Sequence, residues 1–150
     1  MTRKEQAISN FKQGCTCSQA VLLAFSDLIG LDEKTAMKLA GPFGGGMGRM
    51  REVCGAVSGM LMALGLLCGG ETVLAQDEKA ALYAAVQALA AEFRAENGSI
   101  ICRELLAGQA PAADPTPEAR TPGYYQKRAC AQYCGCAAAL LDRYIERNNA

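Results

Sequence analysis

The longest apolar stretch of the chain runs from Val53 to Gly70 and contains no charged residue. Its apolar positions cover every side of a helix, so we predict a central helix, from about Arg49 to Leu67, that other helices cover all round. The stretch reaches the lower length limit of a membrane span, but glycine and serine residues interrupt it, and the chain has no second such run. We therefore expect a buried helix and no membrane insertion.

Helical periodicity and capping residues define the other predicted elements. Thr2 and Thr16 each open a capping box and start helices that extend to about Lys12 and Ile29. Asp32 can cap a short helix at 33–40, and Thr121-Pro122 has the residue types that start a helix. Further helices are predicted at about 76–96, 100–106 and 122–147.

The chain is predicted to form one domain over residues 1–150. Good helix formers dominate its composition, and the sequence contains no convincing strand pattern and no internal repeat. Residues 107–123 hold four of the five prolines and are predicted to form an irregular surface loop. The expected fold is an all-α, single-domain bundle of about five to seven helices around the central apolar, glycine-containing helix.

Two sets of glycines adjoin the start of the central helix. Gly55 and Gly59 lie four positions apart, so they share one helix face, and a face without side chains lets another backbone or a compact inorganic group approach closely. We therefore include both among the candidate cofactor-binding residues. The glycine loop at 44–48 has no GK[ST] sequence and no preceding strand, so helix packing explains it better than phosphate binding.

Charge and composition exclude several classes of function. The chain has 15 basic and 15 acidic residues, which gives no electrostatic basis for binding nucleic acid. It has no histidine, so dyads and metal sites that depend on histidine are excluded. Acid–base or metal chemistry must therefore come from cysteine, carboxylate, lysine or tyrosine side chains.

Cysteine is the residue type that points to chemistry, with eight in the chain. The first residues are charged and lack the apolar core of a signal peptide, so we expect a cytoplasmic protein. In that compartment a thiol-rich protein more often binds metal or carries out redox chemistry than holds structural disulfides. Each single cysteine could still be a small buried residue, because free cysteine packs readily in cores.

Four of the cysteines are predicted to converge from separate helices. Cys17, Cys54 and Cys102 fall in the first turn or two of predicted helices, and Cys130 faces inward on the last one. Helix N-termini favour the thiolate, the form that binds metal. Four convergent thiolates can hold a [2Fe–2S] or [4Fe–4S] cluster or a zinc ion, and two close pairs can equally form reversible disulfides. Cys15 lies outside these helices.

The arrangement of these residues resembles the redox-active C_GCAxxG_C_C family, which is named for its cysteine pattern. The resemblance rests on Gly14–Val21, the glycine loop 44–48, Cys54–Gly59, Cys102–Leu106, and Cys130 with Tyr133. It implies a small helical redox protein from a bacterium or archaeon, with its four cysteines at positions 17, 54, 102 and 130. A similar segment is associated with split-Soret cytochromes, for which an iron–sulfur cluster is suggested. This chain has no CxxCH sequence, so we expect no haem.

Three functions therefore remain open. The first is a redox protein whose metal ligands Cys17, Cys54, Cys102 and Cys130 hold an iron–sulfur cluster, most simply [2Fe–2S]. The second is a metal-free thiol/disulfide protein that uses the same cysteines, and the third is a helical interaction domain that zinc stabilises. The extra Cys134 leaves open which residue on the last helix is the fourth ligand. The sequence leaves open the redox partner protein, enzymatic activity and oligomeric state, a homo-oligomer included.

Overall fold

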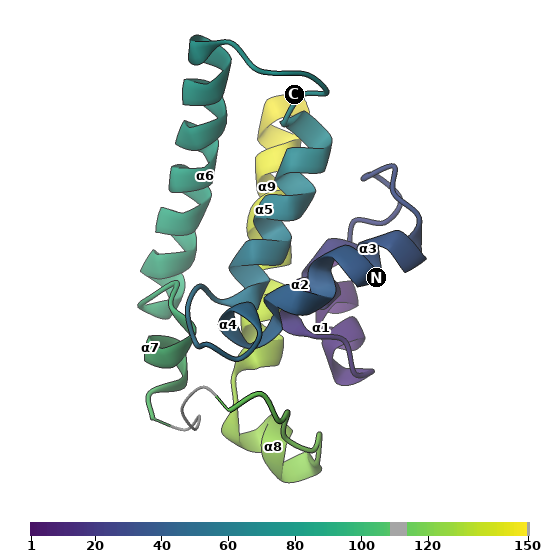
Figure 1. Ribbon diagram of the computed structural model, residues 1–150, viewed down its shortest axis with the longest axis vertical. Coiled ribbons are helices and arrows are strands. Elements are labelled where there is room, and N and C mark those ends of the chain that lie inside the picture. Colours follow the sequence, from purple (N-terminus) through teal and green to yellow (C-terminus); the bar gives the residue numbers. More distant parts are fainter. Residues whose placement is uncertain (109–113, 150) are drawn as a thin grey trace.

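The computed structural model describes residues 1–108 and 114–149, and these residues form an all-α fold (Figure 1). The only β-structure in this part of the chain is an isolated antiparallel bridge between Val53 and Ile101. The helices are α1 (Arg3–Lys12), α2 (Cys17–Leu23), α3 (Glu33–Ala40), the 3-10 helix η1 (Gly41–Phe43), α4 (Gly44–Met47), α5 (Gly55–Cys68), α6 (Gln76–Asn97), α7 (Cys102–Leu106), α8 (Pro122–Lys127) and α9 (Cys130–Asn149). The predicted all-α class is confirmed, with slightly more helical segments than expected.

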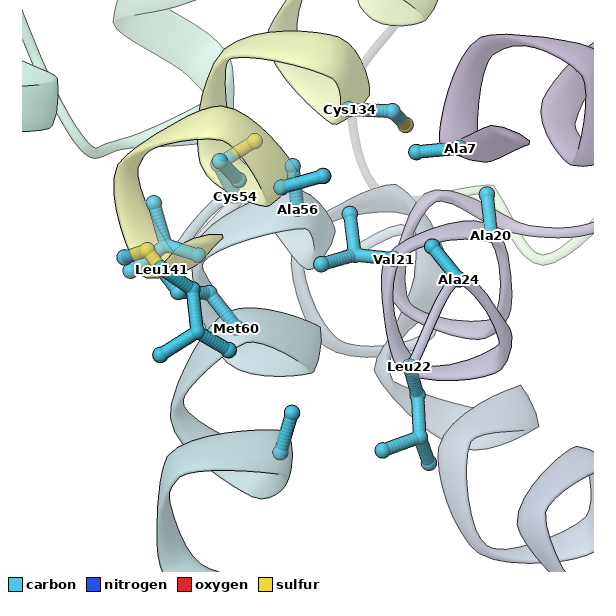
Figure 2. Packing of buried hydrophobic residues seen from close by; sticks show 14 of the residues in the cluster. Ala7, Ala20, Val21, Leu22, Ala24, Cys54, Ala56, Met60, Cys134 and Leu141 are labelled. Atoms are coloured by element: carbon cyan, nitrogen blue, oxygen red, sulfur yellow. The ribbon is translucent and has the colours of Figure 1, made fainter. Parts of the chain in front are cut away.

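The core lies where α1, α2, α5 and α9 pack together. Ala7 on α1, Val21 on α2, Met60 on α5 and Leu141 on α9 are all within 1% of full burial and lie in the same part of the interior (Figure 2). Gly135 lets α9 approach α1, because a Cβ there would lie 2.8 Å from the side chain of Ile8. Small residues such as Gly135 thus allow α1 and α9 to pack closely, and this close packing fixes the positions of the helix ends.

The central helix was predicted to start at about Arg49 and to be covered by other helices on every side. Its start is wrong, and only its first half is covered. Helix α5 starts at Gly55, because Arg49 and Arg51 have positive φ angles (67° and 61°) that a right-handed helix cannot contain. Its first half is buried, but Leu66 is 42% exposed and Cys68 is also exposed. No helix in the described part of the chain is long and apolar enough to cross a membrane.

Helix α2 ends at Leu23 rather than at the predicted Ile29. The chain continues in a tighter turn, in which the amides of Ala24 and Phe25 donate to carbonyl oxygens three residues earlier. This tightening changes which residues face inward: Ile29 is buried, whereas Leu28 is 42% exposed.

The predicted last helix is divided into α8 and α9. Arg128 has an extended backbone (φ −119°, ψ 134°) and ends α8, and α9 begins two residues later at Cys130. Cys130 therefore lies at a helix start, as the other three candidate cysteines do, rather than along a continuous helix. Helix α6 agrees with its predicted bounds, and its residues Leu89 and Phe93 are buried.

The proline-rich segment predicted as a surface loop, 107–123, is described in part. Residues 109–113 lie outside the described residues. Pro117, Glu118 and Arg120 line a cavity at the end of the bundle where α5, α7 and α9 begin. In Figure 1 this end lies at the bottom, with α4, α7 and α8.

Candidate functional site

All four candidate cysteines lie at the starts of helices that meet at one cavity. Cys17, Cys102 and Cys130 are the first residues of α2, α7 and α9, and Cys54 immediately precedes α5. The structure brings all four to the lining of a cavity of about 150 Å³. Cys134, the alternative on the last helix, is fully buried one turn further along α9 and is not among the lining residues.

A capping box fixes Cys17. The Thr16 hydroxyl accepts from the amide of Gln19 at 3.3 Å, and the Gln19 side chain accepts from the amide of Thr16 at 2.9 Å. These paired bonds define where α2 starts, as the sequence predicted. Cys17 is therefore held at the first position of the helix, facing the cavity.

A short ladder of backbone hydrogen bonds fixes Cys54 and Cys102 relative to each other. The amide of Cys54 donates to the carbonyl oxygen of Ile100 at 2.8 Å, and the amide of Cys102 donates to that of Glu52 at 2.6 Å. These bonds flank the bridge between Val53 and Ile101. They also explain why α7 begins at Cys102 and not at the predicted Ile100, since residues 100 and 101 are paired with the chain before α5.

The glycine loop forms one wall of the cavity. Gly44, Gly45 and Gly46 line it, and a Cβ on Gly46 would lie 2.6 Å from the Cβ of Cys102. Gly46 also has a φ of 71°, which favours glycine on conformational grounds. Gly44 is packed in the same way against Thr16, the neighbour of Cys17. The glycine loop thus brings its backbone close to two of the candidate ligands, Cys17 and Cys102.

Gly55 and Gly59 were predicted to let a backbone or a cofactor approach. A Cβ on Gly55 would lie 3.0 Å from the Cβ of Cys17, and one on Gly59 would lie 2.5 Å from the carbonyl oxygen of Ser18. Both glycines therefore face the start of α2. Gly55 also lines the cavity, whereas Gly59 is not among the lining residues.

Arg51 is the most unusual polar residue of the site. Its side chain is 6% exposed, its backbone has a φ of 61°, and its Nη1 donates to the Sγ of Cys102 at 3.7 Å. Within residues 1–108 and 114–149, its Nε and Nη2 atoms have no hydrogen-bond partner. A buried cation with two unpaired donors is costly, and an anionic group bound in the cavity would lower that cost.

Three more arginines and one glutamate complete the charged lining. Arg120 donates to the carbonyl oxygens of Phe11 (3.0 Å) and Cys15 (3.1 Å), and its guanidinium lies 4.1 Å from the centre of the Phe11 ring. Arg128 is paired with Glu118, and Arg49 lies 3.6 Å from the same carboxylate. Four arginines against one glutamate give the cavity a net positive lining.

The thiols have raised pKa values, contrary to what their helix-terminal positions alone would predict. Burial raises the pKa of Cys54 from 9.0 to about 12, and the amides of Ala56 and Val57 only partly offset it. Burial also raises the pKa of Cys102, and the hydrogen bond from Arg51 lowers it. The metal-free site therefore holds neutral thiols, which must lose their protons when they bind a metal.

The thiol of Cys17 has two cysteine neighbours on α9, and the Sγ of one of them, Cys134, donates to the carbonyl oxygen of Cys17 at 3.7 Å. Hydrogen bonding with Cys130 lowers the pKa of Cys17, but hydrogen bonding with Cys134 and burial raise it well above 9.0. Among the described residues, no three histidine, cysteine or acidic side chains are close enough to hold a single metal ion.

Sequence reasoning identified the cysteines but missed the charged lining. Arg49 and Arg51 were placed in the first turn of the predicted central helix, and Glu118 and Arg120 were assigned to a surface loop. One signal was available: Arg51 and Arg128 precede Cys54 and Cys130 by three and two residues. In a chain without histidine, arginine close to a cysteine is the side chain that can stabilise a thiolate or a bound anion.

The fold and the site define a class: small all-α proteins in which cysteines from separate helices line one arginine-rich cavity. A family model described as "Putative redox-active protein (C_GCAxxG_C_C)" matches residues 15–144, so the chain belongs to this family of redox-active cysteine proteins. The match spans all four cavity cysteines. No curated protein and no solved structure matched the chain.

Proposed function

We propose that Cys17, Cys54, Cys102 and Cys130 bind an iron–sulfur cluster, most simply [2Fe–2S], and that the protein transfers electrons. The observation that carries this proposal is the pair of unpartnered, buried guanidinium nitrogens of Arg51 in the same cavity as the four thiols. A cluster with four thiolate ligands carries a net negative charge of roughly two to three units, depending on its redox state. That charge matches the lining of four arginines and one glutamate.

The donor set and the shape of the cavity also fit this group. In a [2Fe–2S] cluster each iron binds two of the four cysteines, so no single iron ion needs three protein ligands. Four thiols from four helices can supply these two pairs. The close approach of Gly46 to Cys102 and of Gly55 to Cys17 leaves no room for a side chain between the backbone and these ligands. When bound, the cluster supplies one-electron transfer.

The chain's own residues have distinct roles in this proposal. The four cysteines are the ligands, and the starts of α5 and α9 direct backbone N–H groups toward the bound negative charge. Phe11, Leu105, Leu106 and Tyr124 line the cavity and limit the access of water. Pro117, in the segment that follows residue 113, also lines the cavity.

The test compares Cys54→Ser with Cys15→Ser. Cys54 lines the cavity, whereas Cys15 lies outside it and its side chain is partly exposed. The protein is purified without oxygen, its visible spectrum is recorded, and iron, acid-labile sulfide and zinc are measured on the same sample. We expect Cys15→Ser to retain visible absorption, iron and sulfide, and Cys54→Ser to lose them. Equal loss in both variants would contradict the ligand assignment, and wild-type protein that stays colourless after reconstitution would contradict the cluster.

A metal-free dithiol function is the second candidate, and the neighbours of Cys17 favour it. Hydrogen bonding with Cys130 and Cys134 shifts the pKa of Cys17, and the Sγ of Cys134 donates to the carbonyl oxygen of Cys17 at 3.7 Å, so Cys17 can form a disulfide with one of these neighbours. In that step an acceptor disulfide gains two electrons and two protons as the two thiols form an S–S bond. Disulfide mapping after exposure to oxidised glutathione separates the two functions: a Cys17 disulfide that forms and is reduced reversibly in metal-free protein supports this alternative.

A further inference from the structure

Arg51 differs from the other three arginines that line the cavity. Arg120 donates to two carbonyl oxygens, and Arg49 and Arg128 both lie against Glu118. Arg51 has only the sulfur of Cys102 as a partner within the described ranges, and two of its nitrogens are left unpaired at 6% exposure. Since most buried polar atoms are hydrogen-bonded, these two donors need an acceptor that binds in the cavity.

The backbone holds Arg51 in place at a conformational cost. Its amide donates to the carbonyl oxygen of Gly45 at 3.3 Å, and its own carbonyl oxygen accepts from the amide of Arg103 at 3.2 Å. Its left-handed conformation (φ 61°) is unfavourable for a residue with a side chain. Met47 and Arg49 have positive φ angles as well, so the strain is concentrated beside the cavity. Strain of this kind persists where the surrounding contacts fix it, and it is concentrated at functional sites.

We infer that Arg51 donates hydrogen bonds to the cluster and its Cys102 ligand and thereby sets the reduction potential of the cluster. This inference rests on the proposed function. Hydrogen bonds to the sulfur atoms and a nearby positive charge stabilise the more negative, reduced state. A guanidinium can reach more than one acceptor at once, because its donors lie in a rigid plane. Arg51 is thus a positioning and tuning residue, and the cysteines remain the ligands.

Arg51→Gln removes the charge and keeps a side chain with a hydrogen-bond donor. The left-handed backbone at position 51 is equally strained with either residue, so the comparison isolates the side chain. Arg103→Gln is the matched control, since Arg103 adjoins Cys102 in sequence but is 53% exposed and paired with Glu52 outside the cavity. The three proteins are reconstituted with iron and sulfide, and the midpoint potential of each is measured by spectroscopic redox titration.

We expect Arg51→Gln to make reduction at least tenfold less favourable, a fall of about 59 mV for a one-electron couple. Arg103→Gln should change the equilibrium constant for reduction of the cluster less than twofold. The electron paramagnetic resonance spectrum of the reduced cluster should also change only in Arg51→Gln. Equal potentials in Arg51→Gln and wild type would overturn the inference while leaving the cluster intact.

Two measurements on metal-free protein separate the failure of this inference from failure of the proposed function. Metal-free Arg51→Gln should have a higher melting temperature than metal-free wild type, because the uncompensated buried charge is gone. If wild type takes up no iron and sulfide, the proposed function fails, and the inference fails with it. Stabilisation of metal-free wild type by sulfate, absent in Arg51→Gln and combined with equal cluster potentials, would instead identify Arg51 as a binding residue for a small oxyanion and overturn the inference.

Discussion

The amide of Cys102 donates to the carbonyl oxygen of Glu52 at 2.6 Å, across 50 residues of sequence. This bond and the one from Cys54 to Ile100 set the spacing of two of the four candidate ligands before any cofactor binds. The backbone rather than the side chains thus fixes the relative positions of Cys54 and Cys102. Residues that support this ladder should therefore affect the site without contacting it.

Ser99 is the clearest test of the ladder. Its hydroxyl accepts from the amide of Ile101 at 2.9 Å and donates to Glu104 at 2.6 Å, and the residue is 7% exposed. Ser99→Ala leaves the partly buried amide of Ile101 unpaired, so we expect it to lower the free energy of unfolding by about 0.5–1.5 kcal/mol. Urea unfolding of the metal-free protein gives this value, and hydrogen exchange should show faster exchange of the Cys102 amide. Substitution of the exposed Thr72 by Ala is the control, and equal stability of the two variants would contradict a role for Ser99.

The glycines of α5 provide a second prediction with a control in the same helix. An added Cβ at Gly59 would lie 2.5 Å from the Ser18 carbonyl oxygen, whereas one at Gly65 has no atom within 4 Å. Gly59→Ala should lower the free energy of unfolding by about 1–3 kcal/mol, because two helix backbones must separate. Gly65→Ala should raise it by about 0.5–1 kcal/mol, because alanine favours the helix. Chemical unfolding of both variants measures these changes. A Gly59→Ala variant with the stability of wild type would show that α2 and α5 are not in tight contact there.

These examples show what the sequence could and could not predict. The capping box at Thr16 placed Cys17 correctly, because the signal is local and the helix starts where the bonds form. The start of α5 was placed six residues too early. Between Gly45 and Arg51 most residues are left-handed, and the amides of Arg49 and Arg51 donate to carbonyl oxygens five and six residues earlier, a loop that no helical periodicity predicts. The break at Arg128 was also missed, since nothing in the local sequence stops a helix there.

The charged lining of the cavity was out of reach for a similar reason. Arg51 lies 67 residues before Glu118 in the sequence, and it meets Glu118 and Arg120 only in the folded protein. Arg51 precedes Cys54 by three residues, but no residue type near Glu118 or Arg120 marks those two positions. Arg51 was therefore placed in the predicted central helix, and Glu118 and Arg120 in a surface loop. The cysteines could be found because the residue type itself is informative.

The raised thiol pKa values predict how stability depends on pH. Burial raises the pKa of Cys54 to about 12, against 9.0 for an unperturbed thiol, and the pKa of fully buried Cys134 is also raised. Between pH 9 and 12 the unfolded chain releases thiol protons that the folded chain retains, so stability falls as pH rises. Each such thiol contributes a slope of about 1.4 kcal/mol per pH unit in this window.

Urea unfolding of reduced, metal-free protein at pH 7, 9 and 10.5 measures this effect. We expect little change from pH 7 to 9 and a steep loss from 9 to 10.5. Cys134→Ala should show a smaller loss over that window, because it has one fewer buried thiol. A stability that stays constant up to pH 10.5 would mean that the thiols ionise in the folded protein.

Arg120 is predicted to hold the segment that covers the cavity. Its guanidinium bonds to the carbonyl oxygens of Phe11 and Cys15 and lies over the rings of Phe11 and Tyr124, at 4.1 and 5.1 Å from their centres. We expect Arg120→Ala to lower the free energy of unfolding by about 1–3 kcal/mol, from hydrogen bonds and ring contacts together. Arg120→Lys should recover little, because an ammonium cannot make two parallel bonds and stack on a ring.

Access to the thiols measures the same contact more directly. In metal-free Arg120→Ala, Cys17 and Cys130 should be alkylated at least several-fold faster than in wild type, as mass spectrometry of timed samples can show. Arg143→Ala is the control, because Arg143 is 53% exposed and its pair with Glu96 lies on the surface. It should change stability by less than about 0.5 kcal/mol and leave both rates unchanged. Unchanged alkylation in Arg120→Ala would mean that the helices themselves, and not the segment that carries Arg120, control entry to the cavity.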